Sequence, residues 1–401
     1  MKNTGFKSWY YYMFFGLMYF VQGSALAYFT NFQKPYLISV GIEPARIGLL
    51  TSILLLPFVM KILIGMLSDK VNFFGLGHRK PYIMTGLLLA AAVFLTVSRV
   101  LPDRNYLLFA SLIVLGSFSV ALFDACTDGY AVEITPKQNY GKVQSIMVSG
   151  KAIGFIILSL VFGYLVQRSS YSIIFIIIGL LMMIPFIFSL FAEEGKKVSP
   201  ENQFDWKAFR LLVKPAFLVF ALYTIFYSFV SFGVDGLITF HMSRSFDAIN
   251  QSIGQYGALR GTGAVIGAII GGFSINRIGY KKMAFISIFI LSSAAILMGI
   301  SSGVTMVLRF AVIWGFAWGL QECIFLSLAM ALADVRIAAS MFAVMMTFSN
   351  LGTAIVEGVA TTLIARVGFQ TVFLFLATFN FINLVILYFF FRIWKAASNS
   401  R

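Results

Sequence analysis

Long apolar runs recur along the whole chain and restrict it to one class of protein. A helix needs about 20 apolar residues to cross a hydrocarbon core of about 30 Å. About twelve runs approach or exceed that length, and they lie at residues 9–31, 46–67, 81–101, 105–131, 143–166, 171–192, 215–240, 252–275, 283–302, 304–333, 341–365 and 369–392. The sequence therefore predicts an all-α integral membrane protein.

A polar stretch interrupts this series at its middle. Residues 193–214 contain a proline, a tryptophan and both acidic and basic side chains. We expect residues 1–192 to form an N-terminal half of about six helices, residues 193–214 a cytoplasmic linker, and residues 215–401 a similar C-terminal half.

The composition and charge agree with a place in the bilayer. Of 401 residues, 60% are hydrophobic and 11% are charged, which is more apolar than a soluble domain of this length. The net charge of +15 would suggest nucleic acid in a soluble protein, but here the basic residues gather in loops. Most of them lie on the side of both termini if the termini are cytoplasmic. We therefore expect a lipid bilayer as partner, no nucleic acid, and cytoplasmic termini.

Residues typical of enzyme active sites are scarce. The two histidines, His78 and His241, lie at loop edges, and the two cysteines, Cys126 and Cys323, lie inside apolar runs. This pattern favours neither a metal site nor a disulfide framework. The phosphate-binding pattern Gly-x-x-x-x-Gly-Lys-Ser/Thr does not occur. The sequence thus predicts a protein that is not an enzyme, has no cofactor or metal, and is not driven directly by ATP.

Ionisable residues inside the spans mark a candidate site, because a charge in hydrocarbon costs at least a few kcal/mol unless it is paired, protonated or hydrated. On a helix, Asp124 and Asp128 lie one turn apart on one face. At about 1.5 Å per residue, Lys61, Lys151 and Asp124 each lie roughly 12–14 Å from a helix end. These charges either form a buried ion pair that only holds helices together, or bind an anionic group while a carboxylate carries a proton.

A loop signature occurs twice, once in each half. Residues 65–70 read Gly-Met-Leu-Ser-Asp-Lys, followed by Gly-His-Arg-Lys at 77–80. Residues 272–277 read Gly-Phe-Ser-Ile-Asn-Arg, followed by Gly-Tyr-Lys-Lys at 279–282. The pair resembles the loop signature of the major facilitator superfamily, whose fold has two six-helix halves around a central cavity. The resemblance implies that Asp69 bonds across helices to stabilise the outward-open state. Asn276 departs from the acidic pattern, so we expect a weaker gate in the second half.

A narrower resemblance rests on the second and fourth spans. The second contains Pro57-x-x-x-Lys61, and the fourth contains Asp124-x-x-x-Asp128-Gly129-Tyr130. Together they resemble the AmpG-type permeases, which include muropeptide importers, acetyl-CoA transporters and siderophore importers. This match covers mainly residues 50–150. It implies a secondary transporter that works as a monomer.

The second half adds fewer charges to its spans. Glu322 lies on the pseudo-repeat of the helix that carries Asp124, with Gln321 and Trp318 beside it. Trp314, on the same helix, could also add stacking to the cavity, but packing between helices explains it at least as well. Arg260 and Glu357 are expected to form an outer gate or a structural pair, and Asp235 to lie near a helix end.

Three sets of candidate residues follow. Those expected to bind substrate are Lys61, Lys151, Asp124, Tyr19, Gln22, Trp318, Gln321 and Glu322. Those expected to carry a proton are Asp124, Asp128 and Glu322. Those expected to gate are Gly65, Asp69, Arg79, Glu133, Asn276, Arg277, Arg260 and Glu357.

The function that these observations favour is proton-coupled import of a mid-sized anionic or polar organic solute, such as a siderophore or muropeptide, by alternating access. The expected partners are a small-molecule substrate and a co-transported proton. The compact loops favour the inner membrane of a bacterium. A proton-driven exporter is the alternative within transport, and a transport-inactive membrane sensor or scaffold is the alternative outside it.

Overall fold

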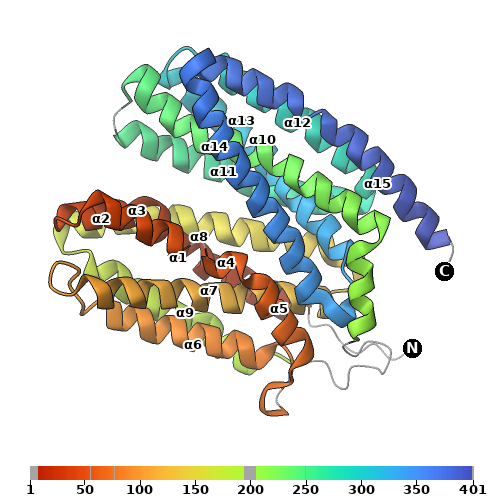
Figure 1. Ribbon diagram of the computed structural model, residues 1–401, viewed down its shortest axis with the longest axis horizontal. Coiled ribbons are helices and arrows are strands. Elements are labelled where there is room, and N and C mark those ends of the chain that lie inside the picture. Colours follow the sequence, from red (N-terminus) through yellow and green to blue (C-terminus); the bar gives the residue numbers. More distant parts are fainter. Residues whose placement is uncertain (1–7, 55, 76, 194–204, 249, 400–401) are drawn as a thin grey trace. The chain divides into compact units, whose positions relative to one another are not determined.

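The computed structural model describes residues 8–54, 56–75, 77–193, 205–248 and 250–399, and every regular element in those ranges is a helix (Figure 1). The elements before the linker are α1 (Ser8–Ala27), η1 (Tyr28–Phe32), α2 (Gln33–Ser39), α3 (Pro44–Ile53), α4 (Leu56–Val59), α5 (Lys61–Lys70), η2 (Phe73–Gly75), α6 (Lys80–Val97), α7 (Tyr106–Ile134), η3 (Lys137–Asn139), α8 (Tyr140–Arg168) and α9 (Ser172–Leu190). Those that follow are η5 (Trp206–Val213), α10 (Pro215–Phe246), α11 (Asn250–Ile278), α12 (Tyr280–Gly299), α13 (Val304–Leu332), η6 (Val335–Ile337), α14 (Ala338–Phe379) and α15 (Ile382–Asn399).

The helices confirm an all-α membrane architecture. Among the described residues, 11 helices are long and apolar enough to cross a membrane. The predicted run that is absent from this set is 46–67, which is divided into α3, α4 and α5. A proline clashes with the carbonyl group four residues before it, and α3 ends at Ile53, four residues before Pro57. The second span is therefore a broken helix, which the run of apolar residues did not predict.

The last two predicted runs meet at a glycine turn. Residues 338–379 form one continuous element, but Gly368 inside it has a φ of 79°. Only glycine adopts such a positive φ without a steric penalty, so the chain reverses there between the predicted runs 341–365 and 369–392. A further interruption, which the sequence did not predict, separates α14 from α15 at residues 380–381.

The chain forms two compact units whose limits differ from the two sequence halves. The first unit contains residues 1–135, 150–205 and 333–343, and the second contains residues 136–149, 206–332 and 344–401. The beginning of α8 therefore belongs to the second unit, and the beginning of α14 to the first. Each half of the sequence thus contributes the start of one helix, α8 or α14, to the unit formed mainly by the other half.

Glycines bring helices close together inside the first unit. A side chain added at Gly150 or Gly154 of α8 would collide with the backbone of α1 at Gly16 and Phe20. The two glycines are four residues apart and so lie on one face of α8. Elsewhere in the unit, α6 packs against α7 and α9.

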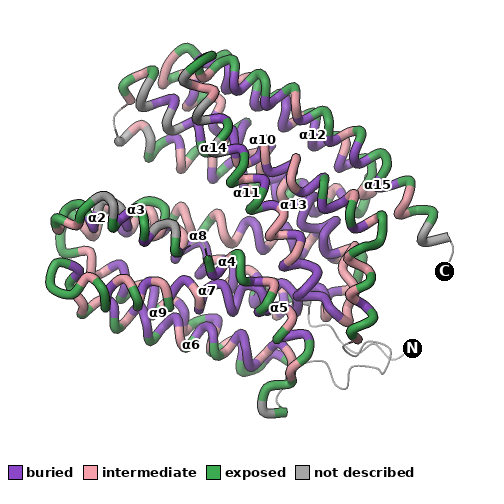
Figure 2. Tube along the Cα trace, in the orientation of Figure 1, coloured by how far each residue is buried: buried purple, intermediate pink, exposed green. Residues whose placement is uncertain are grey.

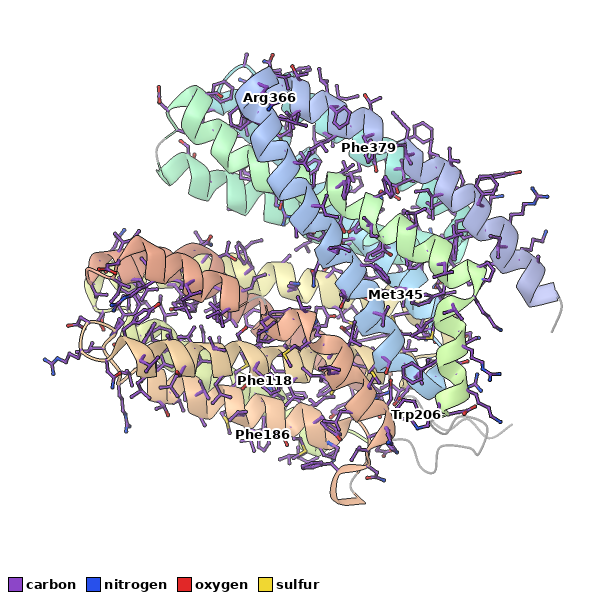
Figure 3. All side chains as sticks on the ribbon, viewed as in Figure 1. Phe118, Phe186, Trp206, Met345, Arg366 and Phe379 are labelled. Carbon is purple, nitrogen blue, oxygen red and sulfur yellow. The ribbon has the colours of Figure 1, made fainter. Side chains whose placement is uncertain are left out.

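The second unit uses the same device between α11 and α13. Gly263 and Gly267 face the backbone of α13, and Gly315 and Gly319 face the backbone of α11. In both pairs the glycines are four residues apart, the spacing that lets two helices in a membrane approach closely. On the other side of the unit, Phe379, labelled in Figure 3, stacks on Phe226 of α10 with 5.4 Å between ring centroids.

Large apolar side chains remain exposed along the helices of both units. Leu107 of α7 and Phe191 after α9 have 76% and 72% of their surface exposed. Buried and exposed residues alternate along single helices, as Figure 2 shows for α12 and α15. A surface of this kind would be unfavourable in water and is suited to lipid.

Candidate functional site

A buried ion pair links the broken second span to α7. The Lys61 ammonium donates to Oδ2 of Asp124, and the two residues are 7% and 2% exposed. Lys61 is the first residue of α5, directly after the break at Met60. The two charges that the sequence predicted at one depth therefore form an ion pair.

The second carboxylate of α7 is bound by a hydroxyl group. Asp128 follows Asp124 by one turn and accepts a hydrogen bond from the Tyr19 hydroxyl of α1. Both residues are buried. Tyr19, Lys61, Asp124 and Asp128, which we call the first-unit cluster, therefore combine two acids, one cation and one hydroxyl away from solvent.

Two further predicted residues of this region differ in their surroundings. Gln22 lies on α1 close to Tyr19 in sequence, and its buried Oε1 has no hydrogen-bond partner among the described residues. Lys151 is half-buried on α8, and no ion pair joins it to another described residue. Its backbone lies against Gly23 of α1. Of the three charges expected at one depth, Lys61 and Asp124 form an ion pair, and a place for Lys151 beside them stays a prediction.

A second ionic group, which we call the loop network, joins the end of α5, the loop that follows it and the end of α7, and consists of Ser68, Asp69, Arg79 and Glu133. The Arg79 guanidinium is 1% exposed and binds Asp69 as an ion pair. Its Nε lies 2.8 Å from Oε1 of Glu133, and its Nη1 lies 2.6 Å from Oγ of Ser68. Burial alone would lower the pKa of Arg79, but the neighbouring Glu133 and Asp69 carboxylates outweigh it and raise that pKa above its ordinary value.

Asp69 also caps a helix that begins about 270 residues later in the chain. Its carboxylate accepts hydrogen bonds from the backbone N–H groups of Ala339 and Ser340, at 3.2 and 2.8 Å, and from the Ser340 hydroxyl. These N–H groups belong to the first turn of α14, where no carbonyl group of the helix can accept them. Gly65 and Gly129 let the backbone of Ala339 approach α5 and α7. The predicted contact of Asp69 across helices is therefore present inside the first unit.

The corresponding loop of the second half is different. Asn276 and Arg277 are exposed at the end of α11, and the described part of the chain gives neither side chain a hydrogen bond or ion pair. Gly272, the counterpart of Gly65, still faces a helix start, because a Cβ there would collide with Gly141 and Ser145 of α8. The close approach of backbones is repeated in both halves, but the ionic network is not.

Glu322 of α13 occupies the place expected for the pseudo-repeat of Asp124. It accepts a hydrogen bond from the Tyr227 hydroxyl of α10. The Tyr227 ring stacks on Phe325 with 4.5 Å between centroids. Gln321, beside it, is fully buried. Tyr227 was missed in the sequence, although Tyr19 on the equivalent helix was noted, and the pseudo-repeat could have identified it.

The remaining ionic group of the second unit consists of Asp235, Tyr256, Arg260, Trp314 and Trp318, which we call the second-unit cluster. Arg260 Nε lies 3.0 Å from Asp235 Oδ1, and Nη2 lies 2.7 Å from Oδ2. The Arg260 guanidinium carbon lies 4.1 Å from the centroid of the Trp318 ring.

Asp235 is the partner of Arg260 among the described residues, and the predicted pairing of Arg260 with Glu357 stays a prediction. The side chain of Glu357 lies outside the described residues. Asp235 was expected near a helix end but lies inside α10, where Trp314 Nε1 donates to its Oδ1 at 2.8 Å and the Tyr256 hydroxyl donates at 3.4 Å. The rotation of each helix decides which residues become partners, and it cannot be derived from expected depth.

An apolar pocket of about 360 Å³ lies beside the helix break in the first unit. Phe118, labelled in Figure 3, lines it from α7, and Leu56, Pro57 and Met60 line it from the broken span. None of the described residues that line it is charged or belongs to the first-unit cluster, and Ser111 is the polar residue among them.

Comparison with known proteins connects this geometry to one family. The sequence model of the Major Facilitator Superfamily matches residues 9–357 and 237–399. The folate-biopterin transporter of Synechocystis sp. is 30% identical over 221 residues, which are 51% of this chain and 43% of that protein. The transporter AmpG 1 of Rickettsia bellii is 22% identical over 404 aligned positions, 94% of this chain and 96% of that protein.

The chain spans less than half the length of the folate-biopterin relatives that it matches. Among solved structures, the fucose:proton symporter FucP of E. coli has a TM-score of 0.74 at 15% identity, with 94% of this chain and 98% of that chain covered. This likeness concerns the fold.

Proposed function

This chain belongs to the Major Facilitator Superfamily, whose members are transporters and not enzymes, and from that premise we propose that it is a secondary active transporter that imports an anionic organic solute together with protons. The observation that carries the proposal is the first-unit cluster. Ionisable groups inside a membrane protein are expensive and are usually kept for transport or proton transfer.

In the proposed mechanism, an anionic group of the solute replaces the Asp124 carboxylate at Lys61. A proton that binds Asp124 neutralises the carboxylate and removes its attraction for the Lys61 ammonium. An anionic group of the solute can then bind Lys61 in place of the carboxylate. When the solute leaves, Asp124 loses its proton and the pair forms again, so solute and proton travel together. Asp128, bound by Tyr19, is the second proton acceptor that we propose.

The relatives suggest which solutes to test. Several are described as folate-biopterin transporters, and folate carries carboxylates that suit a buried lysine. We therefore propose a folate-like or pterin-like solute. The match to AmpG 1 along 94% of the chain favours a second candidate, an anionic muropeptide.

We also propose the membrane, the orientation and the oligomeric state of the chain, which the comparisons leave open. The chain is an integral membrane protein, and some of its relatives are described as chloroplastic. For this chain we propose the bacterial inner membrane with cytoplasmic termini, because most basic residues then lie in the inside loops, and a monomeric state.

The test is uptake of radiolabelled folate, biopterin and an anhydromuropeptide into proteoliposomes under a pH gradient imposed in either direction. We expect accumulation of one solute class on the alkaline side and loss of it in Asp124→Asn. Asp103→Asn, which changes an exposed loop carboxylate, is the control and should transport normally.

Each other outcome contradicts part of the proposal. Flux that is independent of the gradient contradicts proton coupling. Solute movement against the proton flow identifies the exporter. Binding of a solute without any flux identifies a transport-inactive sensor, and neither binding nor flux for every solute rejects the proposed substrates.

A further inference from the structure

The second-unit cluster holds one guanidinium in a fixed position but uses only part of it. Asp235 binds the Nε and Nη2 edge of Arg260. The Nη1 group has no hydrogen-bond partner among the described residues. A guanidinium presents five N–H donors in a planar fork; Asp235 takes two of them, and the two on Nη1 have no acceptor among the described residues.

The Trp318 indole adds a flat surface and a further donor. Arg260 lies over the ring at 4.1 Å, and Phe232 meets the same ring edge-on with 6.1 Å between centroids. Trp318 Nε1 is buried and has no hydrogen-bond partner among the described residues. A buried N–H group without an acceptor is unfavourable, so this donor favours an acceptor that the described residues do not supply.

Asp235 keeps the arrangement together without binding the Nη1 edge of Arg260. Besides Arg260, it accepts hydrogen bonds from Trp314 and Tyr256. Its negative charge is therefore held by three residues of α11 and α13, and it would stay bound if Arg260 also took a ligand. Gly315, whose missing side chain lets α13 lie against the backbone of Arg260, brings the guanidinium to the indole.

We propose that Arg260 and Trp318 form a subsite for a carboxylate that is attached to a flat conjugated part of the transported solute. The carboxylate would accept from the Nη1 edge of Arg260, which is the acceptor geometry that arginine favours. The conjugated part would lie along the indole. Arg260 and Asp235 have 19% and 25% of their side chains exposed, so the subsite is open to a ligand. This inference rests on the proposed function.

The test compares two solutes that share a pterin ring but differ in carboxylates. Folate has carboxylates and biopterin has none. In proteoliposomes containing the full chain, we expect Arg260→Lys to raise the KM for folate about tenfold, because lysine keeps the charge but loses the planar fork, and to leave the KM for biopterin within twofold. Arg309→Lys, an exposed arginine of α13, is the matched control.

Biopterin uptake by Arg260→Lys also reports whether the variant folds. If Arg260→Lys leaves both KM values unchanged, or raises both equally while the thermal unfolding temperature is normal, the carboxylate subsite is rejected. If the variant loses all uptake, direct binding of folate and biopterin to Trp318→Phe decides. That change keeps a ring and removes the N–H group, so it should weaken folate binding severalfold and biopterin binding little. Equal effects on the two reject the subsite.

The proposed function can fail separately. If the unaltered protein transports neither folate nor biopterin, the proposed solute class is rejected and this inference with it. If it transports folate normally but the variants do not distinguish folate from biopterin, only the subsite is rejected.

Discussion

The loop after α5 and the loop after α11 come from one repeated signature, yet among the described residues an ionic network is present at the first and not at the second. Arg79 is buried between Asp69 and Glu133, and Asp69 reaches the first turn of α14. Asn276 and Arg277 are exposed. The helices of the two halves repeat, but the side chains that join them do not.

The charges inside the spans show a similar contrast. In the first half the buried cation is Lys61, which binds a carboxylate on α7. In the second half the cation is Arg260, which binds a carboxylate on α10 and an indole on α13. A repeated backbone therefore supports two different binding chemistries, and we expect the halves to respond differently to equivalent substitutions.

The largest effect should follow from breaking the Lys61–Asp124 pair. Lys61→Met leaves a buried carboxylate without its cation and should lower the free energy of unfolding by about 3–5 kcal/mol. Adding Asp124→Asn removes the uncompensated charge and should restore most of that loss. Thermal unfolding of the purified protein measures both.

Uptake measured on the same variants shows whether the Lys61–Asp124 pair has a structural role or a role in transport. We expect the double variant to be stable but inactive. A double variant that transports normally would show that the pair only holds α5 to α7.

The next largest effect should come from Asp69→Asn. The amide cannot pair with Arg79 as an ion, and its NH2 group replaces one of the two oxygens that accept from the N–H groups of Ala339 and Ser340. We therefore expect a loss of roughly 2 kcal/mol in the free energy of unfolding. Faster hydrogen exchange in residues 338–343 would locate the loss at the start of α14. Unchanged exchange there would mean that the cap contributes little.

A smaller effect should follow from removing the two tyrosine hydroxyls. Tyr19→Phe and Tyr227→Phe each delete one hydrogen bond between helices, which is worth about 0.6–1.7 kcal/mol in a membrane protein. If Asp128 carries a proton and Glu322 does not, only Tyr19→Phe should shift the pH dependence of uptake. Equal shifts would assign proton coupling to both halves.

The smallest effect should come from making the second loop resemble the first. Asn276→Asp adds a carboxylate at an exposed position, where an ion pair contributes about 0–1 kcal/mol. We expect no measurable change in unfolding temperature or uptake. A clear gain in stability would show that Arg277 or another cation forms an ion pair with the new carboxylate.

The sequence predicted the parts of this structure that depend on length and depth. The bilayer sets the length of a span, so the apolar runs identified the helices. The rise of an α-helix is constant, so Lys61 and Asp124 could be placed at one depth. The repeated loop and its family resemblance pointed to the contact of Asp69 across helices.

The unpredicted parts depend on rotation and on local backbone breaks. Lys151 was expected at the depth of Asp124, but no ion pair joins the two in the described part of the chain, because depth says nothing about the face on which a side chain lies. For the same reason, depth could not identify Asp235 as a partner of Arg260. Pro57 was visible in the sequence, but prolines are tolerated in spanning helices, so the division into α3, α4 and α5 could not be derived from it.

The break before α5 has an electrostatic consequence for Lys61. As the first residue of α5, its side chain belongs to the end of the helix where the aligned peptide dipoles leave a partial positive charge. A cation is disfavoured there by about 0.3–1 kcal/mol, whereas an anion is favoured. The dipole of α5 therefore destabilises the charge of Lys61 and stabilises an anion that binds Lys61. It stabilises Asp124 while the ion pair is formed, and it would stabilise a carboxylate of the solute after the exchange.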